Sequence, residues 1–186
     1  MNKRFVKRLL VFFTVLCMTM AMTVPALAAG SGTNATTDDP ANGILQVMLA
    51  YVDDGGNRTY FSAGTCFMVN EEYVVTNKHV FDLDTTDSDG VTLRDTIVET
   101  MGLKSLKTND THLKLYVFAN RDTNVEATVD ANAQSEELDF AALKLSRKIS
   151  GRQSLVLGDS DSIKPQDTVF ALGYPADSIQ NKQSNT

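Results

Sequence analysis

The sequence predicts an all-β protein in which about six strands form a closed antiparallel barrel and one more strand follows. Three observations lead to this prediction. Runs rich in Val, Ile, Tyr, Phe and Thr recur along residues 44–145, with polar turn sequences between them. Their number suits a small antiparallel barrel. A polar connector, SRKISGRQ at residues 146–153, separates them from a last apolar run, TVFALGYP at residues 168–175.

The first three runs follow one another closely. ILQVMLAYV at residues 44–52 leads through the turn DDGGN to RTYFSAGTCFMV at residues 58–69, and NEE then leads to YVVTN at residues 73–77. Asp, Asn and Gly are residues that tight turns favour. We therefore expect three antiparallel strands in a meander.

The next segment departs from the strand pattern. An acidic loop, DLDTTDSDG, precedes TLRDTIVETMGLKSL at residues 92–106, in which Leu93, Ile97 and Met101 recur at every fourth position. This spacing predicts a short surface helix.

Three further apolar runs bring the number of expected strands to six. They are THLKLYVFA at residues 111–119, NVEATVDA at residues 124–131 and DFAALKL at residues 139–145, with ANAQSEEL as a polar turn between the last two. A lone strand after a closed barrel needs more chain to pair with, so we expect residues 168–175 to begin a second element.

The N-terminus has the pattern of a secretory signal peptide. Lys3, Arg4, Lys7 and Arg8 precede the apolar residues 9–21, and an A-x-A site ends at Ala28. A membrane anchor is the competing interpretation, but threonines and a proline interrupt the uncharged stretch, so we favour cleavage near Ala28. The expected product is secreted and contacts a membrane only through this leader, unless a downstream segment exists.

The expected domain organisation has four parts. Residues 1–28 are the signal peptide and residues 29–42, which are polar and almost without apolar side chains, are a flexible mature N-terminus. Residues 43–146 form the barrel, and residues 147–186 form a connector with the start of a second element.

The mature chain is acidic. Cleavage removes four basic residues and no acidic ones, which takes the formal net charge from −6 to −10. No cluster of Lys and Arg remains outside the leader, and a nucleic-acid-binding protein would be expected to have one. Nucleic acid is therefore not an expected partner.

Cysteine and histidine are too few for a disulfide or a metal site. Cys17 lies in the leader, so Cys66 is the one cysteine of the mature chain and has no internal partner. Together with His79 and His112 it does not supply the ligands of a usual zinc site. We expect Cys66 to be a buried small apolar residue and predict no metal or other cofactor.

His79 and Asp139 are the candidate catalytic residues. His79 follows the apolar strand end at residues 73–75, and Asp139 opens the apolar strand at residues 140–145. Taken singly, each is more simply an ordinary residue at a strand end or turn. Taken together, a histidine and a carboxylate that needs a donor are the general base and orienting group expected of a Ser-His-Asp arrangement.

The order of these motifs resembles the trypsin-fold serine proteases. GTCFMVNEEYVVTNKHV is similar to the family block G-S-G-F-I-V…VVTNAHV, and ELDFAALKL follows in the family's order. The resemblance implies a trypsin-like six-stranded antiparallel Greek-key barrel with His79 as general base and Asp139 as its partner, followed by the first strand of a second barrel. LGDSDSIKPQDTVFALGYP resembles the interbarrel segment of HtrA-type proteases, whereas TNKHV and GYPAD resemble glutamyl endopeptidases, so both branches stay open.

No residue of the sequence stands in the family's nucleophile motif. G-x-S-G-G is absent, and Ser160, after Gly158 and Asp159, is followed by Asp161 instead of Gly. We therefore expect the N-terminal part of a secreted serine endopeptidase that acts on protein or peptide substrates and is inactive alone. The alternative is a non-catalytic secreted binding or regulatory module. The sequence predicts no particular oligomeric state.

Overall fold

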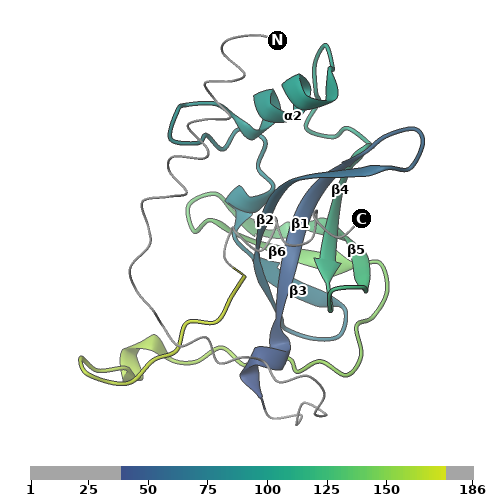
Figure 1. Ribbon diagram of the computed structural model, residues 1–186. Helices are drawn as coiled ribbons and strands as arrows, with labels where there is room; N and C mark the ends of the chain where they lie inside the picture. Colours follow the sequence, from purple (N-terminus) through teal and green to yellow (C-terminus); the bar gives the residue numbers. More distant parts are fainter. Residues whose placement is uncertain (1–38, 175–186) are drawn as a thin grey trace, which may run out of the picture. The chain divides into compact units, whose positions relative to one another are not determined.

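The computed structural model describes residues 39–174 (Figure 1). The predicted signal peptide at residues 1–28 lies outside this range, as does most of the predicted flexible segment at residues 29–42. The last residues of that segment enter a 3₁₀ helix, η1 (Pro40–Gly43). Its cap, Asp39, accepts a hydrogen bond from the amide of Ala41 at 2.9 Å, and the Asn42 side chain donates to the carbonyl of Gly151 at 3.3 Å.

Six antiparallel strands form a closed barrel (Figure 1). The strands are β1 (Ile44–Val52), β2 (Arg58–Met68), β3 (Tyr73–Thr76), β4 (Leu113–Phe118), β5 (Asn124–Ser135) and β6 (Phe140–Leu145). Around the barrel the order is β1-β2-β3-β6-β5-β4, and β4 pairs with β1 to close it. Because β3 lies beside β6, the last four strands form a Greek key. The predicted all-β six-stranded barrel is confirmed.

The barrel interior holds the main hydrophobic core. On β1 the side chains that reach it alternate along the strand: Leu45, Val47, Leu49 and Tyr51. The opposite face of the same strand is also covered, because Met48 and Ala50 pack with Tyr116 and Phe118 in a second cluster. Burial on both faces explains why β1 is apolar almost throughout instead of alternating with polar residues.

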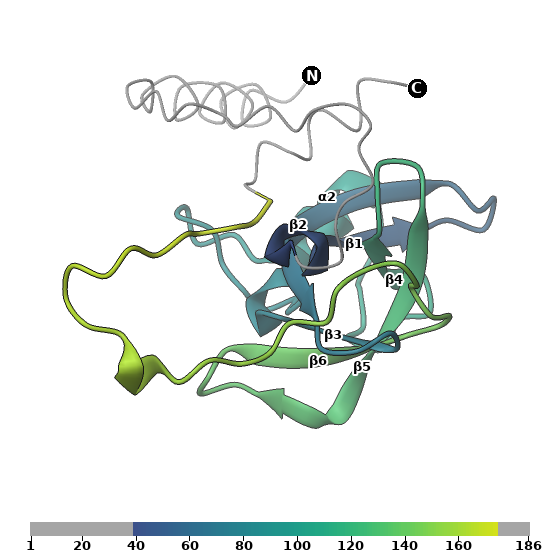
Figure 2. The ribbon, with the colours of Figure 1, turned by 90° about the horizontal axis from the view of Figure 1, so that it is seen from below.

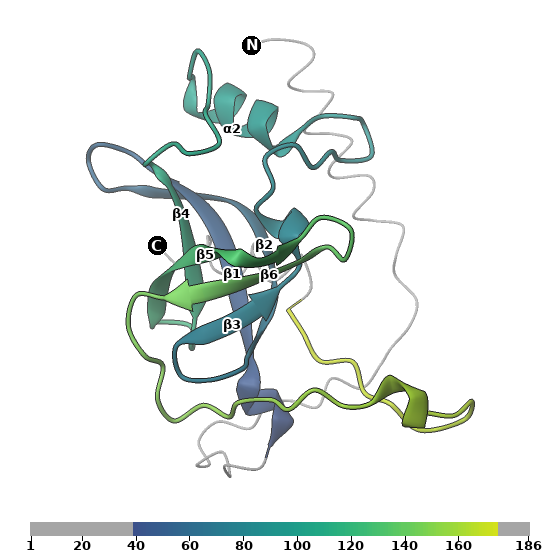
Figure 3. The same cartoon turned by 180° about the vertical axis from the view of Figure 1, so that it is seen from behind.

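The predicted helix is α2 (Leu93–Met101). The Thr92 hydroxyl caps its N-terminus by accepting from the Asp95 amide at 3.0 Å, and Gly102 ends it with a left-handed φ of 65°. Ile97 is fully buried in the core, and Leu93 and Met101 pack against it, so the predicted spacing is confirmed. Figure 3 shows α2 beyond the strand ends, outside the barrel wall.

The turn between the last two strands was predicted too early. The sequence ANAQSEEL was expected to be that turn, but β5 continues through Ser135 and the chain turns at residues 136–139. The β5–β6 register is irregular between Val129 and Gln134. Such an irregularity bends a strand without ending it, and this lets polar residues remain in the strand.

The strand predicted at residues 168–175, which was expected to pair with a second element, stays a prediction. Residues 168–174 pair with no strand of the described chain, and Figure 2 shows this segment as an extended trace outside the barrel. A closed barrel has no free edge to accept another strand. The segment touches the barrel through the Tyr174 amide, which donates to the Thr65 hydroxyl at 2.9 Å.

The connector follows the barrel surface before this segment. Ile149 is buried, and its amide donates to the carbonyl of Glu71 at 3.1 Å. The amide of Leu155 donates to the carbonyl of Met68 at 2.8 Å. The short 3₁₀ helix η3 (Ser160–Ser162) follows in an exposed stretch. Within residues 39–174, no helix has the length and apolar character needed to cross a membrane.

Candidate active site

His79 is carried by a short turn at the end of β3. The strand ends at Thr76, and residues Lys78–Val80 form the 3₁₀ helix η2. Val80 is buried and packs over Gly64 of β2 so closely that a Cβ on Gly64 would lie 2.5 Å from Cγ2 of Val80. The turn is therefore seated on the barrel wall, while the side chain of His79 is 57% exposed.

Asp139 is carried by the turn that leads into β6. Its backbone is left-handed, with φ of 45°, a conformation that Asp and Asn adopt more readily than most residues. β6 is the neighbour of β3 in the barrel, and Thr76 pairs with Ala141. The end of β3 and the start of β6 therefore meet, and this register brings the two predicted residues together.

The two side chains are in direct contact. Nδ1 of His79 lies 2.6 Å from Oδ2 of Asp139, and the backbone amide of His79 donates to Oδ1 at 2.9 Å. Both carboxylate oxygens are thus engaged by the same histidine. We call this pair the His79–Asp139 dyad.

The protonation of the dyad follows from these bonds. The hydrogen bond from the His79 ring, followed by the one from its backbone amide, holds the pKa of the Asp139 carboxyl below its usual range. An ionised carboxylate only accepts, so Nδ1 of His79 carries the proton that it shares with Asp139. In a neutral ring Nε2 then holds a lone pair, and none of the described residues bonds it. The arrangement can accept a proton at Nε2.

A second contact joins the two turns that carry the dyad. The ammonium group of Lys78 pairs with the carboxylate of Glu136, which stands in the turn just before Asp139. The same ammonium group lies 3.6 Å from Oδ2 of Asp82. The hydrogen bond to Glu136 is the main reason that the pKa of Lys78 is raised. Only 16% of the Lys78 side chain is exposed. The sequence did not predict this contact, because no local pattern shows that the turns of Lys78 and Glu136 become neighbours.

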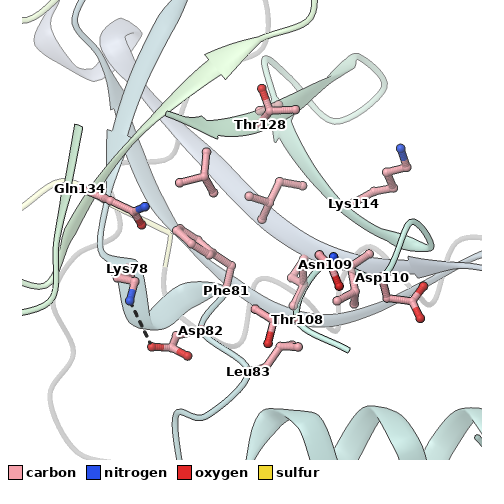
Figure 4. Close-up of a pocket in the computed structure, with 15 residues that line it drawn as sticks. Lys78, Phe81, Asp82, Leu83, Thr108, Asn109, Asp110, Lys114, Thr128 and Gln134 are labelled. Atoms are coloured by element: carbon pink, nitrogen blue, oxygen red, sulfur yellow. Dashed lines mark ion pairs between the residues drawn. The ribbon is translucent and has the colours of Figure 1, made fainter. Parts of the chain in front are cut away.

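A cavity of about 660 Å³ lies next to η2 (Figure 4). In Figure 4, Lys78 and Gln134 stand at one side of it, Thr128 above, and Lys114 and Asp110 at the other side. Its apolar lining comes from Leu49, Phe81, Leu83, Leu113, Leu115, Ala127 and Val129. Neither His79 nor Asp139 lines the cavity, so the cavity is separate from the dyad. The two are neighbours through Lys78 of η2, which lines the cavity and precedes His79.

The other residues singled out from the sequence lie elsewhere. Cys66 is fully buried, as predicted, and burial raises the pKa of its thiol. His112 bonds Asp110 and Asp54, away from the dyad. Ser160 stands in η3, and no hydrogen bond joins it to His79 or Asp139 within the described residues. In residues 39–174, no three His, Cys, Asp or Glu side chains stand close enough together to hold a metal ion.

Comparison with known protein families gives one match. The sequence model of a family described as a trypsin-like peptidase domain matches residues 64–185. The match begins in β2 and spans both His79 and Asp139. No curated protein matches the chain.

Proposed function

The chain belongs to the trypsin-like peptidase family, and from this we propose that it supplies the general base and the orienting carboxylate of a secreted serine endopeptidase. The observation that carries the proposal is the 2.6 Å contact between Nδ1 of His79 and Oδ2 of Asp139. Both residues come from turns of one closed barrel, which is a rigid support for catalytic geometry.

In this proposal His79 takes the proton of a serine hydroxyl through Nε2 as the serine attacks the substrate carbonyl. It later returns that proton to the leaving amine. Asp139 holds the ring in the tautomer that leaves Nε2 free and stabilises the imidazolium that forms. The substrate is a protein or peptide, and the chemistry of these residues requires no metal or cofactor.

The nucleophile is the part of the triad that these residues do not contain. The sequence lacks a G-x-S-G-G segment, and no hydrogen bond joins Ser160 to the dyad within the described residues. We therefore propose that a serine downstream of residue 186 completes the triad, with glycine amides that stabilise the tetrahedral intermediate. The 186 residues alone are expected to be inactive.

The finer assignments have sequence support only. The leader-like residues 1–28 and the single mature cysteine support secretion. The interbarrel segment favours an HtrA-type enzyme, whereas TNKHV and GYPAD favour a glutamyl endopeptidase. Cleavage preference would be set by the part of the protein that carries the nucleophile.

The first experiment is to read the coding sequence beyond Thr186 and to express the form that contains a G-x-S-G-G segment. A fluorophosphonate probe should label its serine, and peptide hydrolysis should fall by about 10⁴-fold or more in His79→Ala and in Asp139→Asn. Asn tolerates the left-handed backbone at this position, so the second variant should keep the fold.

His112→Ala is the matched control, because His112 also has an aspartate 2.8 Å from Nδ1 but stands outside the dyad. It should keep labelling and turnover. Full activity in His79→Ala would contradict the assignment. A stop codon directly after Thr186, with no labelling of the expressed chain, would instead favour the non-catalytic module.

A further inference from the structure

Asn77 immediately precedes the turn that carries His79. It occupies the N-cap position of η2, where an asparagine side chain usually accepts a hydrogen bond from an amide of the first turn. Here the side chain makes no such capping bond. The local structure of its own turn therefore does not account for this side chain.

The side chain of Asn77 reaches across to Asp139 instead. Its Nδ2 donates to the backbone carbonyl of Asp139 at 3.1 Å and to the carboxylate oxygen Oδ2 at 3.2 Å. Both partners are acceptors, so only the NH₂ end of the amide can face them. Asn77 thus acts as a double donor to one residue that is 62 positions away in the chain.

The oxygen that Asn77 contacts is the one that faces the imidazole. Oδ2 of Asp139 also accepts from Nδ1 of His79, while Oδ1 accepts from the backbone amide of His79. Of these three donors, Asn77 is the one that does not belong to the histidine. The bond to the Asp139 carbonyl, which also accepts from the Lys78 amide at 3.3 Å, fastens the left-handed backbone from which the carboxylate projects.

We propose that Asn77 is a positioning residue of the dyad, whose amide fixes the rotation of the Asp139 carboxylate so that Oδ2 faces Nδ1 of His79. Its importance for catalysis rests on the proposed function. The geometric part does not, because every contact lies within the barrel.

Two substitutions separate this role from a structural one. Asn77→Ala removes the donor. Asn77→Asp keeps the size and is a good N-cap, but it replaces the donor with a carboxylate that faces Asp139. If Asn77 is a positioning donor, Asn77→Asp should disturb the dyad more than Asn77→Ala does. If it has a capping or space-filling role, Asn77→Asp should disturb the structure less than Asn77→Ala does. Which of the two variants disturbs the dyad more therefore decides between the positioning role and the structural role.

The first readout is NMR on the 186-residue chain and needs no activity. We expect the downfield Nδ1 proton resonance of His79 to weaken in Asn77→Ala and to be lost in Asn77→Asp, while the titration midpoint of the Asp139 carboxyl rises in the same order. Asn120→Ala is the matched control: it removes an asparagine side chain that bonds the amides of Asp122 and Thr123 in a distant turn. It should change neither signal.

The second readout is turnover in the nucleophile-bearing form, where we expect kcat to fall roughly tenfold in Asn77→Ala, as for a lost bond to a charged group, with KM little changed. Unchanged NMR signals in Asn77→Ala, or signals in Asn77→Asp as strong as those of the unsubstituted chain, would overturn the inference. If one variant does not fold, the other decides through the Asp139 titration. An inactive nucleophile-bearing form with the predicted NMR order would refute the proposed function and leave the positioning of Asp139 standing.

Discussion

Gly64 lies beneath the turn that carries His79, and Val80 fills the space above it. The distance of 2.5 Å from a hypothetical Cβ to Cγ2 of Val80 leaves no room for any side chain. Val80 is β-branched and buried, so it cannot move aside by a simple change of rotamer. The position of His79 thus depends on residue 64 of β2 being a glycine, because Val80 occupies the space where a side chain would be.

Gly64→Ala should therefore both destabilise the barrel and disturb the dyad. We expect a loss of about 1–3 kcal/mol in the free energy of unfolding, as for an overpacked core, together with a weaker His79 Nδ1 proton resonance. Gly158→Ala is the matched control, because nothing lies within 4 Å of its Cβ position. Adding Val80→Ala to Gly64→Ala should recover part of the loss. Additive losses in the double variant, measured by denaturant unfolding, would contradict the proposed clash.

At the scale of elements, His112 connects the β1–β2 turn to the chain before β4. Its Nδ1 lies 2.8 Å from Asp110 and its Nε2 lies 3.2 Å from Asp54, while its ring stacks on Tyr51 at 5.1 Å. A neutral imidazole donates from only one nitrogen, so both contacts are hydrogen bonds only when the ring is protonated. This pair of contacts should depend on pH.

The direction of this pH dependence follows from the pKa shifts of His112 and Asp110. The hydrogen bond to Asp110, and then that to Asp54, raise the pKa of His112 above its ordinary 6.5. The histidine contribution is therefore fully present below pH 6.5 and is lost as the pH rises through the higher folded-state value. Hydrogen bonds from the His112 amide and ring lower the pKa of Asp110 from 3.8. The contribution of Asp110 to stability is therefore present above pH 3.8 and is lost as the pH falls through the lower pKa of the folded state.

We predict that the stability advantage of the unsubstituted chain over His112→Gln is largest between about pH 4 and pH 6.5 and shrinks toward pH 9. Denaturant midpoints across this range provide the measurement. Asp54→Asn should flatten the profile only in part, because Asp110 remains. A difference between the chain and His112→Gln that does not vary with pH would show that the ring acts through stacking on Tyr51 alone.

At the scale of the whole molecule, the barrel is followed by a segment whose apolar side chains face solvent. Val156 is 94% exposed and Phe170 is 87% exposed, and Leu157 and Val169 are also exposed. These residues contribute little to the barrel core. Exposed apolar surface of this kind favours association with other surfaces.

Replacing two of these residues should change association and leave folding unchanged. We expect Leu157→Ser with Phe170→Ser to reduce self-association in sedimentation velocity, while the free energy of unfolding stays within about 0.5 kcal/mol. Lys164→Ser in the same stretch is the surface control. A large loss of stability in the double variant would mean that the segment is part of the folded core.

The sequence predicted the parts of this molecule that follow from local pattern. Apolar runs rich in β-favouring residues located all six strands, and the four-residue spacing of Leu93, Ile97 and Met101 located α2. The end of β5 was missed because an irregular register has no local signal. The strand at residues 168–175 was predicted from composition, and it stays a prediction, because the described residues supply no edge for it to pair with.

For the site, the sequence pointed to His79 and Asp139 through motif order, and the structure brings them together. The roles of Asn77, Lys78 and Gly64 could not be predicted in the same way. Each depends on which strands become neighbours, and the β3–β6 pairing is set by the whole barrel.

The β3–β6 pairing also has a kinetic consequence. The two members of the dyad are 60 residues apart in the chain, and they meet only when strands from the two halves of the barrel join. Contacts of such long range require a large loss of chain entropy and form slowly compared with local hairpins. During refolding, the appearance of the His79 Nδ1 proton resonance should therefore report the β3–β6 pairing, after the hairpins have formed.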